Sequence, residues 1–150
     1  MTGEALLAWT HILAFLALAV FLSCEAALCH HEWMNESVVR RLARLDILYG
    51  ISVALVLASG LARVFWGVKG AGWYGHNPLL WTKIGVLVVM AVLAIHPTRA
   101  FLRWCRALDA GGALPPPEEI RRARLFVMWQ AHLLPLIPLA AVFMARGYGG

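Results

Sequence analysis

The stretch ALLAWTHILAFLALAVFLSCEAALC, from Ala5 to Cys29, decides the fold of this chain. It runs for about 25 residues without Lys, Arg, Gly or Pro, and at about 1.5 Å per residue a helix of that length crosses a bilayer. Two polar residues interrupt it, His11 and Glu25. They stand 14 positions apart, so they lie within about 40° of each other on one helix face. A polar stripe of this kind requires partners from other helices.

The composition of the whole chain indicates a membrane protein. Of its 150 residues, 61% are hydrophobic, and the mean hydropathy is +0.72, whereas soluble domains are roughly 45–50% apolar. One domain, residues 1–150, fits this length. The formal net charge is +5, but the basic residues stand at the ends of apolar runs. That placement suits anionic lipid headgroups and argues against nucleic-acid binding.

Four apolar runs predict four membrane-spanning helices. They are Ala5–Cys29, Leu45–Trp66, Leu79–His96 with a more polar continuation toward Arg106, and Leu125–Ala145. We interpret the first run as a permanent span because an acidic residue precedes it and no small-residue cleavage site follows. In the polar stretch before the second run, Asn35 or Ser37 could cap a helix that begins at Val38. The predicted fold is an all-α, integral-membrane four-helix bundle.

The basic residues predict the orientation of this bundle. Nine of them flank the runs on one side: Arg40, Arg41, Arg44, Arg99, Arg103, Arg106, Arg121, Arg122 and Arg124. Three flank the other side: Arg63, Lys69 and Arg146. By the positive-inside rule both termini lie outside the cytoplasm, N-out and C-out. We therefore expect a multi-pass protein of the bacterial inner (cytoplasmic) membrane.

With that orientation, the polar residues inside the spans fall into two layers. The outer layer holds His11, Lys83 and Arg63, edged by Trp9, Trp66 and Trp81, and the inner layer holds Glu25, Asp46, His96, Gln130 and His132. A charge at mid-membrane costs roughly 2.5–3.5 kcal/mol on insertion scales, so such side chains are expected to face the bundle. Structural roles stay open for several of them. Glu25 could pair with Arg40 or Arg44, Lys83 could snorkel outward, and His132 could be a hydrogen-bonded packing residue.

His11 is the strongest candidate for chemistry. A neutral imidazole in an outer pocket can ligate haem iron, and Lys83 at the same depth could pair with a porphyrin propionate or assist proton transfer. Trp9, Phe15 and Trp81 could stack on the porphyrin, although membrane aromatics also serve as packing and interfacial residues. The alternative for His11 is a hydrogen bond to a neighbouring helix.

Five stretches carry a resemblance to known proteins. Over nearly its full length the chain resembles an uncharacterised family of small bacterial four-helix membrane proteins, which brings no established activity. The matching stretches are LARLDILYG (42–50), GLARVFWGVKG (60–70), NPLLWTK (77–83), HPTRAFLRW (96–104) and LIPLAAVFMARG (136–147).

More distantly, two residues resemble those of a characterised family. His11 in AWTHILAF and Lys83 in WTKIGVLV match the helix-1 His and helix-3 Lys of HemJ-type protoporphyrinogen IX oxidases, which are related to copper-resistance D-like membrane domains. The resemblance implies a four-helix protein with haem b, His11 as an axial ligand and Lys83 as a functional polar group. The segment LAVFLSCEAALCHH, with Glu25, departs from the Trp/Gly and Pro-Arg pattern of that family.

Three functions are compatible with these features. The first is a haem b protein with a redox role, either a HemJ-like oxidase or an electron-transfer relative. In it Lys83 and Glu25 handle protons or propionates, and a porphyrin or quinone-type small molecule is the partner. The second is an oligomeric proton- or metal-handling transporter with an inner ionisable cluster of Glu25, Asp46, His96 and His132, in which His132 is a weaker metal ligand. The third is an assembly subunit of a larger membrane complex.

Overall fold

The chain folds into an all-α bundle, as predicted. The computed structural model describes residues 2–66, 72 and 75–149, and within this part it contains helices and no strand. The elements are α1 (Thr2–Leu28), the short 3₁₀ helix η1 (His31–Trp33), α2 (Glu36–Trp66), α4 (Pro78–Asp109), α5 (Pro117–Leu133) and α6 (Leu136–Ala145). Four segments are long and apolar enough to cross a membrane: α1, α2, α4, and α5 together with α6.

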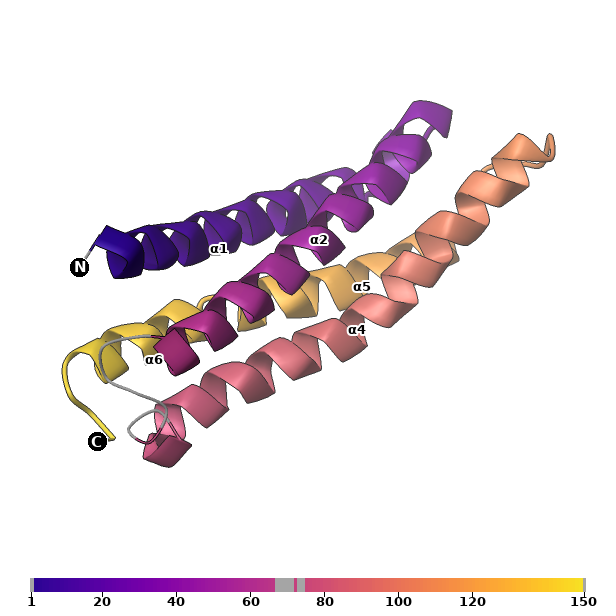
Figure 1. Cartoon of the computed structure of the whole chain (residues 1–150). Coiled ribbons are helices and arrows are strands. Elements are labelled where there is room, and N and C mark those ends of the chain that lie inside the picture. Colours follow the sequence, from indigo (N-terminus) through magenta and orange to yellow (C-terminus); the bar gives the residue numbers. More distant parts are fainter. Residues whose placement is uncertain (1, 67–71, 73–74, 150) are drawn as a thin grey trace.

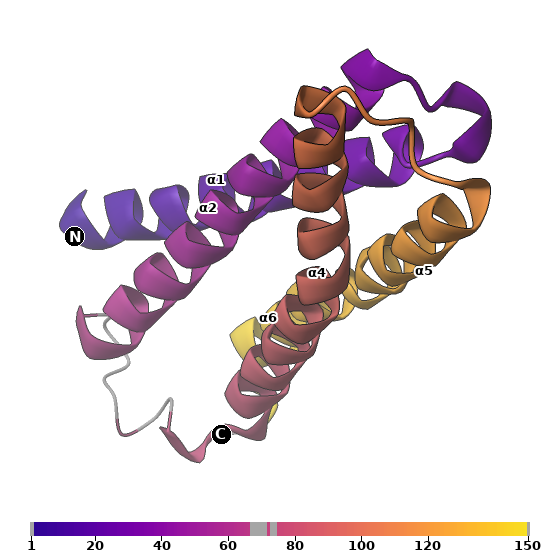
Figure 2. The ribbon, with the colours of Figure 1, turned by 90° about the vertical axis from the view of Figure 1, so that its right-hand side faces the viewer.

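The four spans form a closed ring. Helix α1 packs along α2, α4 packs along α5 and α6, and the two pairs meet where α2 contacts α4 and α1 contacts α5 (Figure 1). Both termini lie at the same end of the bundle, as an even number of spans requires. The connection from α1 to α2 and the loop after α4 lie at the far end (Figure 2). The assignment of these two ends to the two sides of a membrane stays a prediction.

The interior and the exterior of the bundle are both apolar. Leu18, Leu42, Met90 and Phe101 are fully enclosed where the four spans meet. The outward faces carry large hydrophobic side chains that a soluble bundle would cover or replace with charges. Examples, all more than half exposed, are Leu16, Val20, Ile51, Leu55 and Val92. A lipid-facing surface explains this pattern.

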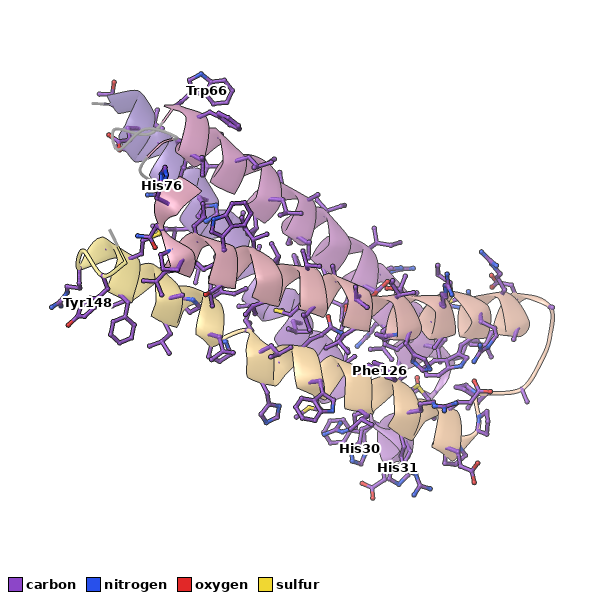
Figure 3. The ribbon with its side chains drawn as sticks, turned by 90° about the horizontal axis from the view of Figure 1, so that it is seen from below. His30, His31, Trp66, His76, Phe126 and Tyr148 are labelled. Carbon is purple, nitrogen blue, oxygen red and sulfur yellow. The ribbon has the colours of Figure 1, made fainter. Side chains whose placement is uncertain are left out.

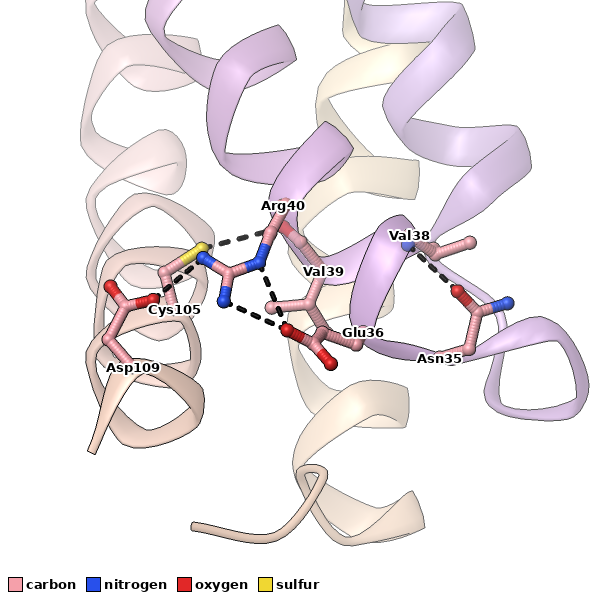
Figure 4. A network of polar contacts seen from close by, with 7 residues as sticks. All are labelled: Asn35, Glu36, Val38, Val39, Arg40, Cys105 and Asp109. Carbon is pink, nitrogen blue, oxygen red and sulfur yellow. Dashed lines mark hydrogen bonds and ion pairs between the residues drawn. The ribbon is translucent and has the colours of Figure 1, made fainter. Parts of the chain in front are cut away.

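Helix α2 begins earlier than its apolar run. The side-chain oxygen of Asn35 accepts a hydrogen bond from the Val38 N–H at 3.0 Å, and its carbonyl accepts one from Val39 at 3.0 Å. Asn35 is therefore the cap, and the predicted start at Val38 is two residues late. The polar first turns are held by Arg40, whose guanidinium pairs with Glu36 at 2.9 Å and with Asp109 of α4 at 2.7 Å (Figure 4).

The fourth apolar run, predicted as a single helix over Leu125–Ala145, is divided in two. Helix α5 already begins at Pro117 and ends at Leu133, and α6 begins at Leu136. Pro135 stands in the break. It has no N–H to donate to the carbonyl of Ala131, and its ring crowds that carbonyl, so the helix is interrupted there.

Polar contacts and aromatic residues mark the two ends of the bundle. Arg124 of α5 donates through Nη1 to the carbonyls of Ala26 and Cys29, both at 3.1 Å, and so satisfies the end of α1. At the opposite end lie Trp66 and Tyr148, which are 78% and 62% exposed (Figure 3). Exposed aromatics at this level match an interfacial belt.

Candidate functional site

The polar side chains inside the spans form two groups that are separated along the bundle. His11 and Glu25 stand 14 positions apart on α1, which corresponds to about 21 Å along the helix axis. Lys83 interacts electrostatically with His11, and Asp46 with Glu25. The predicted catalytic residues Lys83 and Glu25 therefore belong to different groups, the outer group and the inner group.

The outer group is built around a hydrogen bond from α1 to α2. His11 Nδ1 lies 2.8 Å from Ser59 Oγ, and Ser59 Oγ donates its single proton to the Leu55 carbonyl at 2.6 Å. The serine hydroxyl can then only accept from the imidazole, so Nδ1 carries the proton and donates it to Ser59. This tautomer leaves the lone pair of Nε2 free. Among the described residues Nε2 has no hydrogen-bond partner, and it is not one of their fully enclosed polar atoms, so it remains accessible.

Helix α2 also makes room for the His11 ring. A Cβ at Gly60 would lie 3.2 Å from His11 Cε1, which is tighter than an ordinary side-chain contact. The position next to Ser59 therefore accepts the imidazole because it has no side chain. The hydrogen bond to a neighbouring helix, considered above as the alternative role of His11, is present and at the same time orients the ring.

Two cations complete the outer group. Arg63 follows Ser59 by one helical turn on the same face of α2, and Lys83 comes from α4. Both are half-buried, both act electrostatically on the His11 imidazole, and Arg63 acts on Lys83. Within the described residues, the five ion pairs include neither cation. Three basic groups from three helices thus interact electrostatically, without an acidic partner among the described ion pairs.

The aromatic residues predicted to stack on a porphyrin are placed differently from one another. Trp9 and Trp81 are 59% and 60% exposed, and Trp81 Nε1 donates to the Gly75 carbonyl at 3.0 Å. Both therefore lie on the outer surface, where they suit the membrane interface. Phe15 is half-buried against the core and is the member of the set that faces the interior.

The inner group is acidic. Glu25 is 1% exposed, its Oε1 is fully enclosed without a hydrogen-bond partner, and Asp46 of α2 acts on it electrostatically. Asp46 is 7% exposed and accepts a hydrogen bond from Thr98 Oγ1 at 2.8 Å. The predicted structural bridge from Glu25 to Arg40 or Arg44 is absent among the described ion pairs. Arg40 pairs with other acids instead.

A buried hydrogen bond that the sequence analysis missed lies beside this pair. Tyr49 Oη donates to Gln130 Oε1 at 2.8 Å, and Gln130 Nε2 donates to the Phe126 carbonyl at 3.2 Å. The two side chains are 3% and 1% exposed. The sequence could have indicated Tyr49, because it follows Asp46 by three positions and therefore shares its helix face.

Two predicted members of the inner layer do not join the buried acids. His96 stacks on Phe126 with ring centroids 4.4 Å apart, and His132 is exposed and bonds through Nδ1 to the Met128 carbonyl at 2.7 Å. Among the residues that the structure describes, no three His, Cys, Asp or Glu side chains are arranged to hold a metal ion. The inner group therefore consists of Glu25 and Asp46, with polar neighbours.

The chain belongs to the family described as predicted membrane protein (DUF2214), whose model matches residues 3–149. This agrees with the resemblance to an uncharacterised membrane family, and it assigns no activity. Neither a curated protein nor a solved structure matches the chain. A multi-pass membrane protein in contact with the lipid bilayer follows from the family and from the four apolar spans.

Proposed function

We propose that this protein binds haem b through His11 and has a redox role in the membrane. The single observation that carries the proposal is the bond of His11 Nδ1 to Ser59 Oγ at 2.8 Å, which with the Ser59–Leu55 bond assigns the proton to Nδ1 and leaves Nε2 without a partner among the described residues. A ligating imidazole in a metalloprotein bonds through one nitrogen and donates a hydrogen bond from the other. His11 is prepared for ligation in this way.

The charges around His11 also fit the cofactor. Haem b carries two propionate groups, and the outer group offers two half-buried cations, Arg63 and Lys83, that have no acid among their described partners. Cations at this depth are costly when they are unpaired. Two carboxylates would neutralise them, and a metal ion without such groups would add to the repulsion.

Each residue near His11 has a distinct role in this proposal. The haem would supply one-electron chemistry, with its potential set by the axial ligand and its surroundings. His11 would hold the iron and Ser59 would orient His11, while Arg63 and Lys83 would hold the propionates and Phe15 would contribute apolar contact. The HemJ-type resemblance adds a reaction class, the oxidation of a porphyrinogen, and simple electron transfer is the other member of the redox class.

The test is a visible spectrum of the purified protein in detergent, oxidised and dithionite-reduced, with haem supplied during expression. We expect a Soret band with sharp α and β bands on reduction, and we expect His11→Ala to abolish it. His132→Ala is the matched control, because His132 also lies within a span but is exposed and bonded to its own helix. A full spectrum in His11→Ala would overturn the assignment of the ligand, and a protein that takes up no haem would overturn the function.

A further inference from the structure

We propose that Glu25 and Asp46 form a proton-binding pair inside the membrane, which takes up and releases one proton through a groove between α2 and α4. This site is separate from the proposed haem site and does not depend on it. Its substrate is the proton itself, and no bond between heavy atoms forms or breaks. The argument rests on the burial of Glu25, on the missing counter-charge and on an opening beside Asp46.

The first step is the condition of Glu25. Its side chain is 1% exposed, and Oε1 is enclosed with no hydrogen bond. A buried polar atom without a partner costs free energy, and a buried charge costs much more. Native interiors keep few such atoms, so each one calls for an explanation. A carboxyl group that must both accept and release a proton explains it, because a fully bonded carboxylate would hold one state.

The second step is the balance of charge around the pair. Among the described residues, the ionisable groups that act on this region are Asp46 and Tyr49 of α2, Cys29 directly after α1, and Arg124 of α5. Asp46 adds a second acid, and Tyr49 donates its proton to Gln130.

The only cation in this set brings no counter-charge to Glu25. Arg124 is bonded through Nη1 to the carbonyls of Ala26 and Cys29, and the described ion pairs do not include it. Two ionised carboxyls would therefore face each other in an apolar bundle with no paired cation. One proton bound to the pair removes that repulsion.

The third step is access. A groove of about 350 Å³ lies between α2 and α4, and Asp46 and Thr98 line it. Gly50, Ala91 and Ala94 also line it, and their small size keeps it open. One oxygen of Asp46 accepts from Thr98, while the other has no hydrogen-bond partner in the described part of the chain and is not among its enclosed atoms. Asp46 lines the groove and is 7% exposed, whereas Glu25 does not line it and is 1% exposed, so Asp46 is the member of the pair that meets the groove.

These features give the pair an order of events. A proton from water reaches the free oxygen of Asp46 in the groove and is shared with the enclosed carboxyl of Glu25, and the same path returns it. Thr98 holds the Asp46 carboxyl in place by donating to its other oxygen, so it is a positioning residue. A buried acid that serves only as packing would keep its proton permanently.

The experiment is infrared spectroscopy of the haem-free protein in liposomes, in the region of the protonated carboxyl C=O stretch. We expect a band whose intensity changes with pH and which moves to lower frequency in D₂O. Glu25→Gln, which keeps the shape of the side chain, should remove the band. Glu118→Gln is the control, because Glu118 is an exposed acid at the start of α5, and it should leave the band unchanged.

Two further variants keep the test decisive if Glu25→Gln does not fold. Both variants leave Glu25 intact: Asp46→Asn changes the other acid of the pair, and Thr98→Val removes the hydrogen bond that Asp46 accepts, so each should shift the frequency of the band. The proposal is overturned if the band is absent, if it responds to neither pH nor D₂O, or if all three variants leave it where it was. Such a result would not touch the haem proposal, whose readout is the visible spectrum.

Discussion

The outer and inner polar groups of this bundle are opposite in sign, and neither neutralises the other. The outer group joins His11, Arg63 and Lys83 without an acid among their described partners, and the inner group joins Glu25 and Asp46 without a paired cation. About 21 Å of helix separates them along α1. Polar residues that only hold helices together are expected to pair with each other. Groups without an opposite charge point instead to partners from outside the chain. The basic outer group suits an anionic ligand, and the acidic inner group suits a proton.

The largest effects should be seen when the His11 and Glu25 variants are each measured by both the haem spectrum and the carboxyl infrared band. His11→Ala should abolish the haem spectrum and leave the carboxyl infrared band, and Glu25→Gln should remove the band and leave the spectrum. The reason is distance, since the two groups share a helix but no contact or hydrogen bond is described between them. If either variant removes both signals while circular dichroism stays helical, the two groups act as one site and the comparison fails.

A smaller effect is expected from the serine that orients His11. Ser59→Ala removes the acceptor of the Nδ1 proton, and loss of such a support typically weakens metal binding by about 10–100-fold. The measurement is a haem titration in detergent. Ser52→Ala is the matched control, because Ser52 is buried on the same helix, bonds to the Leu48 carbonyl at 2.8 Å and is seven positions from Ser59. Equal losses in the two variants would mean that haem binding tracks general stability.

Removal of the Tyr49 hydroxyl tests how much the hydrogen bond beside the inner group contributes to stability. Tyr49→Phe leaves Gln130 Oε1 buried without its donor. An orphaned buried acceptor costs about 1–3 kcal/mol in soluble proteins, whereas hydrogen bonds between membrane helices average about 0.6 kcal/mol. We expect a loss of about 1 kcal/mol in the free energy of unfolding, measured by SDS titration. Tyr148→Phe, at an exposed site, should change it by less than about 0.5 kcal/mol.

The sequence was sufficient for the number of spans and for the separation of His11 and Lys83 from Glu25 and Asp46. Hydropathy is a property of the run itself, so the four spans and the depth of His11, Lys83, Glu25 and Asp46 follow from counting along each helix. The break at Pro135 could also have been read from the chemistry of proline, but the high hydropathy of the run on both sides concealed it.

The partners of these residues could not be read in the same way. Which side chain on α2 meets His11 depends on how the helices pack, and the small residue that admits the ring, Gly60, gives no polar signal of its own. For the same reason the inner layer was predicted too widely. His132 has the right depth but faces outward, while Tyr49 has the right face and was not considered.

The smallest effect is expected for labelling of Cys29, at the edge of the inner group. It tests whether water reaches this end of α1. Cys29 follows Glu25 by one helical turn, is fully buried, and its thiol lies 3.8 Å from the Ile120 carbonyl. Because the Cys29 thiol is enclosed, neither water nor a labelling reagent reaches it in the folded protein, and buried thiols of this kind are inert. In a protein with Cys24→Ser and Cys105→Ser, we expect no maleimide labelling of the folded state from about pH 7 to pH 10, a range that spans the usual thiol pKa. The same protein in SDS should label fully and serves as the control.

Labelling of the folded protein that rises through about pH 8.5 would mean that water reaches this end of α1. Glu25 would then be hydrated from that side, and the groove at Asp46 would not be its only route to a proton.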